Sequence, residues 1–221
     1  VTVAANACEN CHQPHTAPGK ARLLNSAADE ANCYTCHTGT VAGKTAPVKN
    51  MQSEMTKISG HAVGSYTGLH DAAEANLATN RHVECADCHN PHQTNATAGT
   101  TTTVSGSPVL PGSLKGVNGI TIAGVATAAA TSEYEVCLKC HGDSTGKKAS
   151  TITRTVAAST AGENNVRKEF LTTNSSFHPV AGNNPNAKTT SLIAPLTANT
   201  IITCSSCHSN NAGVGAGGTG P

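Results

Sequence analysis

The pattern Cys-x-x-Cys-His occurs five times in this chain of 221 residues and constrains the fold more than any other feature. The five copies contain all ten cysteines, so none is left over for a separate role. Successive copies begin 25, 52, 52 and 67 residues apart, which indicates one short unit separated by variable loops and not a repeat of fixed period. The copies begin at Cys8, Cys33, Cys85, Cys137 and Cys204.

This spacing is typical of covalent haem attachment. Each cysteine of a copy forms a thioether to one vinyl group of a haem, and the histidine that follows reaches the iron as its proximal ligand. The sequence therefore predicts five covalent c-type haems. Their attachment residues are Cys8, Cys11, Cys33, Cys36, Cys85, Cys88, Cys137, Cys140, Cys204 and Cys207, and their proximal ligands are His12, His37, His89, His141 and His208.

Three other uses of paired cysteines fit the pattern less well. A disulfide scaffold does not require every cysteine to sit in a tight pair. Zinc knuckles also use Cys-x-x-Cys, but zinc does not require a histidine directly after the second cysteine. With 11 histidines in the chain, such a histidine would occur by chance at about 5% of positions. A redox dithiol is rarely needed five times in one chain.

Six histidines remain to fill the second axial position of five irons. They are His15, His61, His70, His82, His92 and His178. The near match in number predicts that each iron is held by two imidazoles, with His15, His61, His82, His92 and His178 as distal ligands. His70 lies in an acidic stretch and is the predicted spare. Met51 and Met55 are the other candidate ligands, but their spacing favours one face of a short helix.

The sequence around the distal candidates supports their assignment. His15 and His92 each lie three residues after a proximal histidine, from where they cannot reach the opposite face of the same ring but can reach an adjacent haem. His82 lies three residues before Cys85, and so close to a haem. His61 in Gly-His-Ala-Val-Gly and His178 in Phe-His-Pro-Val-Ala-Gly lie among small residues, which let the backbone approach a flat ring.

The scarcity of aromatic residues points to haem as the core. Aromatic side chains normally supply much of the buried area of a core, yet they make up only 2% of this chain. We expect a mostly irregular coil with short α-helices and a minor β-hairpin, in a single domain over residues 1–221. The hairpin is predicted over 116–125 around Asn118-Gly119, a short helix over 71–79, irregular chain over 95–104 and a Gly-rich tail over about 210–221.

Charge and hydropathy bear on partners and location. The formal charge is +1, and five haems with their propionates would bring it to about −4 when oxidised and about −9 when reduced. No basic stripe indicates nucleic acid, and no apolar run is long enough for a membrane span. The sequence begins at Val1 without a basic or apolar leader, so we expect a mature exported chain whose signal peptide has been removed.

The chain resembles the extracellular cytochrome filaments of metal-reducing microbes, often called microbial nanowires, and more widely the doubled Cys-x-x-Cys-His cytochromes. The resemblance rests on CENCHQPH, GHAVG, CADCHNPH, CLKCH followed by HPVAG, and CSSCHSN, which are spread over almost the whole chain. In that family the haems stack in an unbroken chain and subunits join end to end. The histidine of the N-terminal CHxxH element ligates a haem of the neighbouring subunit.

The resemblance implies a multihaem cytochrome c built around a stacked haem chain, located outside the cell, with His15 as the ligand to a neighbouring subunit. Its partners would be further copies of itself in a head-to-tail homopolymer, and other cytochromes or extracellular electron acceptors. Five haems depart from the four, six or eight of its known members. The sequence adds one hint: only His178 lies between His141 and His208, so two irons compete locally for one distal ligand.

We therefore expect a polymerising conductor of electrons from the cell surface to extracellular acceptors. The alternative is a soluble periplasmic or cell-surface carrier that acts as a monomer, with the same motifs and ligands. An enzyme such as a nitrite or sulfite reductase would need an open axial position with acid–base groups beside it. The chain has no Cys-x-x-Cys-Lys variant and more histidines than irons, so we expect no enzymatic activity.

Overall fold

The computed structural model describes residues 8–19, 21–39, 49–57, 60–66, 82–100, 102–103, 106–144, 165–185, 190 and 192–208. The chain divides into two compact units, Val1–Ala73 with His82–Asp87, and Glu74–Arg81 with Cys88–Pro221. The division falls inside the third motif, so that Cys85 is counted with the first unit and Cys88 with the second. The assignment of residues 1–221 to a single domain stays a prediction.

The first unit contains short helices joined by turns. They are α1 (Asp29–Tyr34), α2 (Met51–Met55) and the 3-10 turn η1 (Val63–Ser65), and α3 (Cys85–Cys88) begins in this unit. Asn50 caps the start of α2, because its side chain accepts a hydrogen bond from the Ser53 amide at 3.0 Å. Met51 and Met55 lie on this helix, as their spacing predicted.

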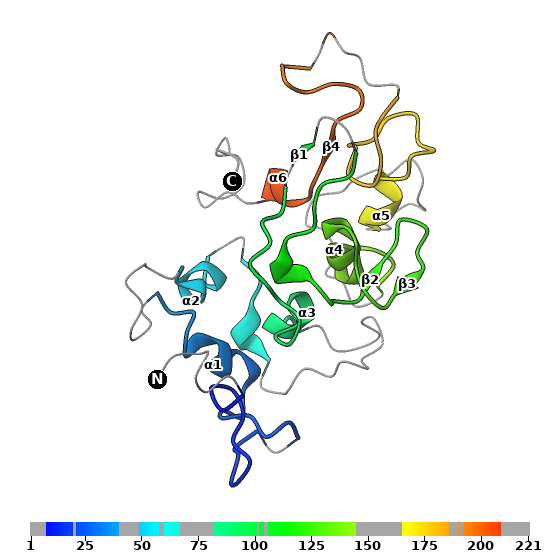
Figure 1. Cartoon of the computed structure of the whole chain (residues 1–221). Helices are drawn as coiled ribbons and strands as arrows, with labels where there is room; N and C mark the ends of the chain where they lie inside the picture. Colours follow the sequence, from blue (N-terminus) through cyan, green and yellow to red (C-terminus); the bar gives the residue numbers. More distant parts are fainter. Residues whose placement is uncertain are drawn as a thin grey trace. The chain divides into compact units, whose positions relative to one another are not determined.

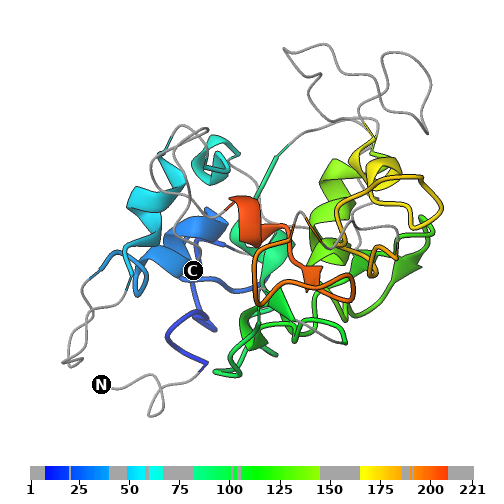
Figure 2. The ribbon, with the colours of Figure 1, turned by 90° about the horizontal axis from the view of Figure 1, so that it is seen from above.

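The second unit is built around α4 (Glu133–His141), which lies beside the hairpin of β2 (Gly119–Ile120) and β3 (Ala126–Thr127), as Figures 1 and 2 show. The Glu135 carboxylate caps the helix, since it accepts hydrogen bonds from the amides of Thr131 and Ser132 at 2.6 and 3.2 Å. Val117, Ala130 and Val136 form the apolar cluster beneath the helix, and Cys88 packs against it.

The predicted hairpin is present, but its turn was wrongly assigned to Asn118-Gly119. The turn lies at 121–125, where Thr121 and Gly124 are hydrogen bonded and Gly124 has φ +81°. Gly119 is a strand residue instead, and a Cβ there would meet Glu135 Cβ at 2.8 Å. The Asn118 side chain accepts a hydrogen bond from Lys139 Nζ at 2.8 Å. Both residues therefore serve contact between the hairpin and α4.

The remaining elements of the second unit are η2 (Gly112–Leu114), α5 (Val166–Glu169), α6 (Ser205–His208) and the antiparallel pair β1 (Thr102–Thr103) with β4 (Ile201–Ile202). The strand β1 corrects the expectation of irregular chain over 95–104. Thr102 and Thr103 are extended because they pair with Ile202 and Ile201 far along the chain, a contact that local composition does not encode.

Arg167 on α5 joins three segments of the second unit. Its guanidinium contacts both carboxylate oxygens of Asp143, at 2.5 and 2.9 Å, and donates to the carbonyl of Ile122 at 2.8 Å. The side chain of Asn165 also donates to Asp143. The forked guanidinium thus ties α5 to the hairpin and to the residues that follow His141.

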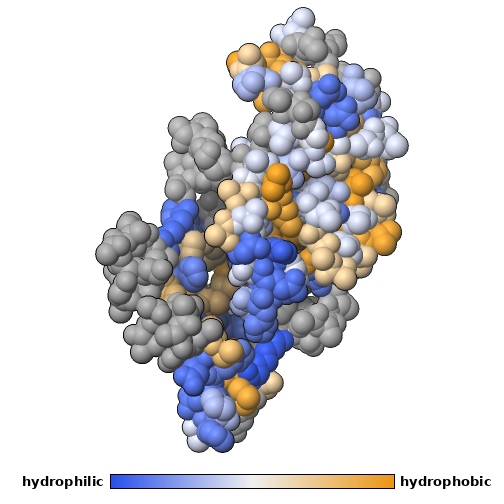
Figure 3. Space-filling model, in the orientation of Figure 1, coloured by the Kyte–Doolittle hydropathy of each residue, from blue (hydrophilic) through white to orange (hydrophobic). Residues whose placement is uncertain are grey.

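The prediction of mostly irregular chain with short helices and a minor hairpin is confirmed for the described residues. Buried apolar side chains there are few: Ala17, Leu24, Val63, Val117, Ile120, Ala130, Val136, Leu138, Phe177 and Val180. Figure 3 shows hydrophobic residues at several separate places on the drawn face. The described helices include none long and apolar enough to cross a bilayer. The predicted helix over 71–79 and the tail over 210–221 lie outside the described residues.

Candidate haem sites

Each of the five motifs folds as a helical turn. Motifs one, two and five repeat the same hydrogen bond, in which the histidine amide donates to the carbonyl of the first cysteine at 2.8 to 3.0 Å. Motif three forms α3, and motif four forms the end of α4. Residues three and four apart share one face of a helix. The turn therefore presents both thiols and the imidazole of a motif on one side, as attachment and proximal ligation of one haem require.

Two proximal imidazoles are oriented by the backbone. His12 Nδ1 lies 2.8 Å from the carbonyl of Arg22, and His89 Nδ1 lies 2.8 Å from the carbonyl of Ser113. A carbonyl accepts only, so Nδ1 carries the proton and Nε2 carries the lone pair. Iron-ligating histidines are commonly held in this way. His37, His141 and His208 are exposed to solvent on their turns.

Cysteines of successive motifs meet in the first unit. None of the ten cysteines, which all belong to the described part of the chain, forms a disulfide. The Cys33 and Cys85 side chains are hydrogen bonded to each other. This contact raises the pKa of Cys33, where burial acts in the same direction, and lowers the pKa of Cys85, where burial opposes it. Burial and the neighbouring Cys36 raise the pKa of Cys11. Motif two therefore lies beside both motif one and motif three.

The second unit repeats this arrangement. The Cys137 and Cys204 side chains are hydrogen bonded to each other, and this contact, burial and the nearby Glu133 raise the pKa of Cys137. Cys88 acts on Cys137 in the same direction but more weakly. Motif four therefore lies beside motifs three and five. Neighbours in sequence order are neighbours in space within each unit, a relation that the spacing of the motifs did not reveal.

Two distal candidates occur in the same local structure. The amide of Val63 donates to the carbonyl of His61 at 2.9 Å, and the amide of Val180 donates to the carbonyl of His178 at 2.8 Å. Both valines are buried, 4% and 6% exposed, while both histidines are exposed. A buried valine two residues on thus anchors a tight turn that holds the imidazole outward.

The chain near His178 also approaches the fifth motif. The amide of Ile202, two residues before Cys204, donates to the carbonyl of Pro179 at 3.0 Å. A cavity of about 110 Å³ is lined here by Val180 and Ala181, by Ile201, Ile202 and Thr203, and by residues 107–111 and 132–134. This places His178 on the segment that runs beside motif five, and the pairing of His178 with a particular iron stays a prediction.

His82 is held differently. Its ring stacks on that of Tyr66, with 4.0 Å between centroids and 16° between planes. Ligand-type atoms of His82, Glu84 and Asp87 lie within 4.8 Å of one another. The Glu84 side chain is 1% exposed, and its amide donates to the Asp87 carboxylate at 2.8 Å. A buried carboxylate thus lies beside a predicted iron ligand.

The other distal candidates lie on exposed turns. Both His15 and His92 are solvent-exposed, and their ligation of a haem other than the one of their own motif stays a prediction. The amide of His92 donates to the side chain of Asn90 at 3.1 Å, which tightens that turn. The predicted spare, His70, lies outside the described residues. Met51 and Met55 are half-buried on α2.

Sequence reasoning missed three residues next to the motifs. Glu133, Tyr66 and Arg167 contact motif five, His82 and the segment after His141, respectively. Only Glu133 carried a local signal, because it lies four residues before Cys137 on a helix and so on the same face. Tyr66 and Arg167 reach their partners through contacts between distant segments.

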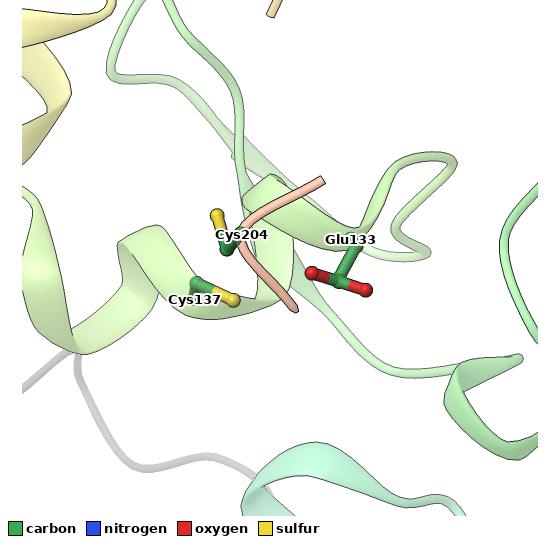
Figure 4. Close-up of side chains that lie close together, drawn as sticks. All are labelled: Glu133, Cys137 and Cys204. Atoms are coloured by element: carbon green, nitrogen blue, oxygen red, sulfur yellow. The ribbon is translucent and has the colours of Figure 1, made fainter. Parts of the chain in front are cut away.

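The donor set fits haem better than a metal ion alone. Glu133, Cys137 and Cys204 bring ligand-type atoms within 4.8 Å of one another (Figure 4), but the two cysteines belong to different motifs, each with its own second cysteine and histidine. Five turns that each present two thiols and an imidazole define a multihaem c-type cytochrome.

Comparison with known proteins gives the family. A family model described as outer membrane cytochrome MtrC/MtrF-like, domains II/IV, matches residues 1–176, and the chain belongs to this family. The family comprises extracellular multihaem cytochromes that bind c-type haem and transfer electrons. The match includes the first four motifs, while His178 and the motif at Cys204 lie beyond it. No curated protein and no solved structure matches the chain.

Proposed function

We propose that this chain conducts electrons outside the cell along five covalent haems arranged in the order of their motifs. The observation that carries the proposal is the side-chain contact between cysteines of successive motifs, Cys33 with Cys85 and Cys137 with Cys204, together with the electrostatic influence of Cys36 on Cys11 and of Cys88 on Cys137. Each cysteine is an attachment point, so adjacent cysteines bring the edges of successive haems together. When bound, the haems supply one-electron redox chemistry.

The residues of the chain hold these haems and keep substrates from the irons. We propose that the proximal histidines and the distal set His15, His61, His82, His92 and His178 occupy both axial positions of every iron. Six-coordinate irons exchange electrons without binding a substrate, so the protein is a conductor and not an enzyme. A high-spin haem signal in the purified wild-type protein would contradict this part of the proposal.

We further propose that the chain polymerises head to tail, with His15 ligating a haem of the next subunit. Two features support this step: His15 lies on an exposed turn of the first unit, and motifs four and five share a single histidine in the sequence between them. A repeated contact that does not close on itself produces a filament. The resemblance to extracellular cytochrome filaments favours the same assembly.

The test combines a haem count with electron microscopy. A pyridine haemochrome assay should return five haems per chain, and micrographs of the purified protein should show filaments. His15→Ala should keep the haem count and abolish the filaments, whereas His70→Ala, a change of the same size at the predicted spare, should leave both unchanged. Dispersed wild-type particles with five haems would reject polymerisation and leave the monomeric carrier. Far fewer than five haems would reject the proposal as a whole.

A further inference from the structure

Glu133 connects the attachment turns of motifs four and five. It is the first residue of α4, one helical turn before Cys137. Its carboxylate accepts two hydrogen bonds from Ser205, the first residue of α6, one from the amide to Oε1 and one from the hydroxyl to Oε2, both at 2.8 Å. Figure 4 shows the carboxylate beside Cys137 and Cys204. One side chain thus ties together segments 72 residues apart.

The donor side of this contact is held in place by its own network. The Ser205 hydroxyl lies 2.9 Å from Thr203 Oγ1, and the Thr203 side chain is 6% exposed. The amide of Thr203 donates to the Ser206 hydroxyl at 3.1 Å. The Glu133 carboxylate therefore meets a preorganised pair of donors, and charge-assisted hydrogen bonds of this kind are about twice as strong as neutral ones.

The carboxylate also lies next to two haem attachment points. A carboxylate oxygen of Glu133 and the sulfur atoms of Cys137 and Cys204 all lie within 4.8 Å of one another. All three residues are half-buried, which limits the screening of their interaction by solvent. Each sulfur is predicted to form a thioether bond to a different haem. The negative charge of Glu133 would therefore lie beside the edges of both haems.

We infer that Glu133 is a positioning residue that joins the haems of motifs four and five and lowers the reduction potential of both. Reduction adds an electron to each haem, and a fixed negative charge at the haem edge disfavours that addition. This inference rests on the proposed function, because it requires haems attached at Cys137 and Cys204. It goes beyond that function because it assigns one side chain of this protein an effect on the reduction potentials of both haems.

The test is a spectroelectrochemical titration of the holoprotein carrying Glu133→Gln. The substitution removes the charge and keeps an oxygen that accepts from Ser205. We expect two of the five Nernst components to move to more positive potential, by an amount that raises the reduced-to-oxidised ratio at fixed potential about three- to tenfold. The other three components should not move. A variant in which no component moves, or in which all five move together, would overturn the inference.

Ser205→Ala supplies a second variant with the opposite expected sign. It keeps the carboxylate and removes the hydroxyl that partly neutralises it, so the same two components should move to more negative potential. If the contact between Glu133 and Ser205 were purely structural, both variants would have a lower thermal midpoint and no reduction potential would shift. Glu54→Gln is the matched control, since Glu54 on α2 pairs with Lys57, just after this helix, at 2.7 Å; it should shift no potential. An equal shift in this control would reject a specific role for Glu133.

The haem count of the wild-type protein separates this inference from the proposed function. Five haems with unshifted potentials in both variants would refute the role of Glu133 alone. A low haem count would refute the proposed function.

Discussion

At the scale of single residues, a distal ligand needs an exposed imidazole on a segment whose backbone conformation is fixed. The proposed distal ligands His61 and His178 both have this property, because each lies in a tight turn anchored by a buried valine two residues further on. His82 is held in place by stacking on Tyr66. The buried valines and Tyr66 hold these histidine segments in place before any ligand binds. This reduces the conformational entropy that is lost when an imidazole ligates an iron.

Removal of one distal ligand should change the spin state of one haem. In His178→Ala, one iron loses its second imidazole and becomes five-coordinate or binds water, so about one fifth of the haem should change from low-spin to high-spin. Electron paramagnetic resonance of the oxidised protein measures this fraction. His70→Ala should keep all haems low-spin. If His178→Ala were also entirely low-spin, His178 would not be a ligand.

At the scale of elements, the packing of the hairpin against α4 and Arg167 requires a close approach of its backbone. Gly119 lets the strand contact Glu135 on α4, and Gly124 turns the chain beneath the guanidinium of Arg167, whose Cζ would lie 3.1 Å from a Cβ at that position. Because Arg167 also holds Asp143, which follows the fourth motif by two residues, the turn geometry is coupled to the end of the motif-four helix. The hairpin therefore supports a haem-binding segment.

Gly124→Ala should destabilise the second unit. The φ of +81° is costly for a residue with a Cβ, by about 1–2 kcal/mol, and the new methyl group would also displace Arg167. Thermal unfolding of the holoprotein should show a lower midpoint. Gly106→Ala shares the positive φ, +74°, but has open space at the Cβ, so its loss should be smaller. Gly64→Ala has neither feature and should be neutral. Equal midpoints for Gly124→Ala and Gly64→Ala would contradict the role of the turn.

At the scale of the whole molecule, the described polypeptide buries few large apolar side chains. In the second unit the central cluster consists of Val117, Ala130 and Val136. Burial of these three small side chains contributes only a few kcal/mol of stabilising free energy. That is far less than is needed to offset the conformational entropy that the chain loses on folding. Covalent haems are the remaining apolar groups that this class of protein contains, so we expect folding and haem attachment to be coupled.

Loss of the fourth attachment site should therefore unfold more than its own turn. The double substitution Cys137→Ser and Cys140→Ser should give four haems per chain and make the second unit sensitive to limited proteolysis. The same change at Cys8 and Cys11 should also give four haems but leave the second unit protected. A motif-four variant with four haems and wild-type protease resistance would show that the polypeptide core suffices without that haem.

The sequence by itself determined the chemistry of the sites. Five Cys-x-x-Cys-His motifs identify covalent haem, because thioether formation and proximal ligation depend on residues three and four apart, within one turn of chain. The scarcity of aromatic residues likewise predicted irregular chain with short elements. The pairing of Met51 with Met55 on a helix was also local, and was confirmed for the same reason.

Only the tertiary structure decided which motifs are neighbours and which side chains lie between them. The contacts of Cys33 with Cys85, of Cys137 with Cys204 and of Glu133 with Ser205 join residues 52 to 72 positions apart. Contacts at such separations depend on how loops of variable length fold back, and the entropy of closing a loop changes little with its length. The local sequence therefore does not predict these contacts, which depend on the tertiary packing.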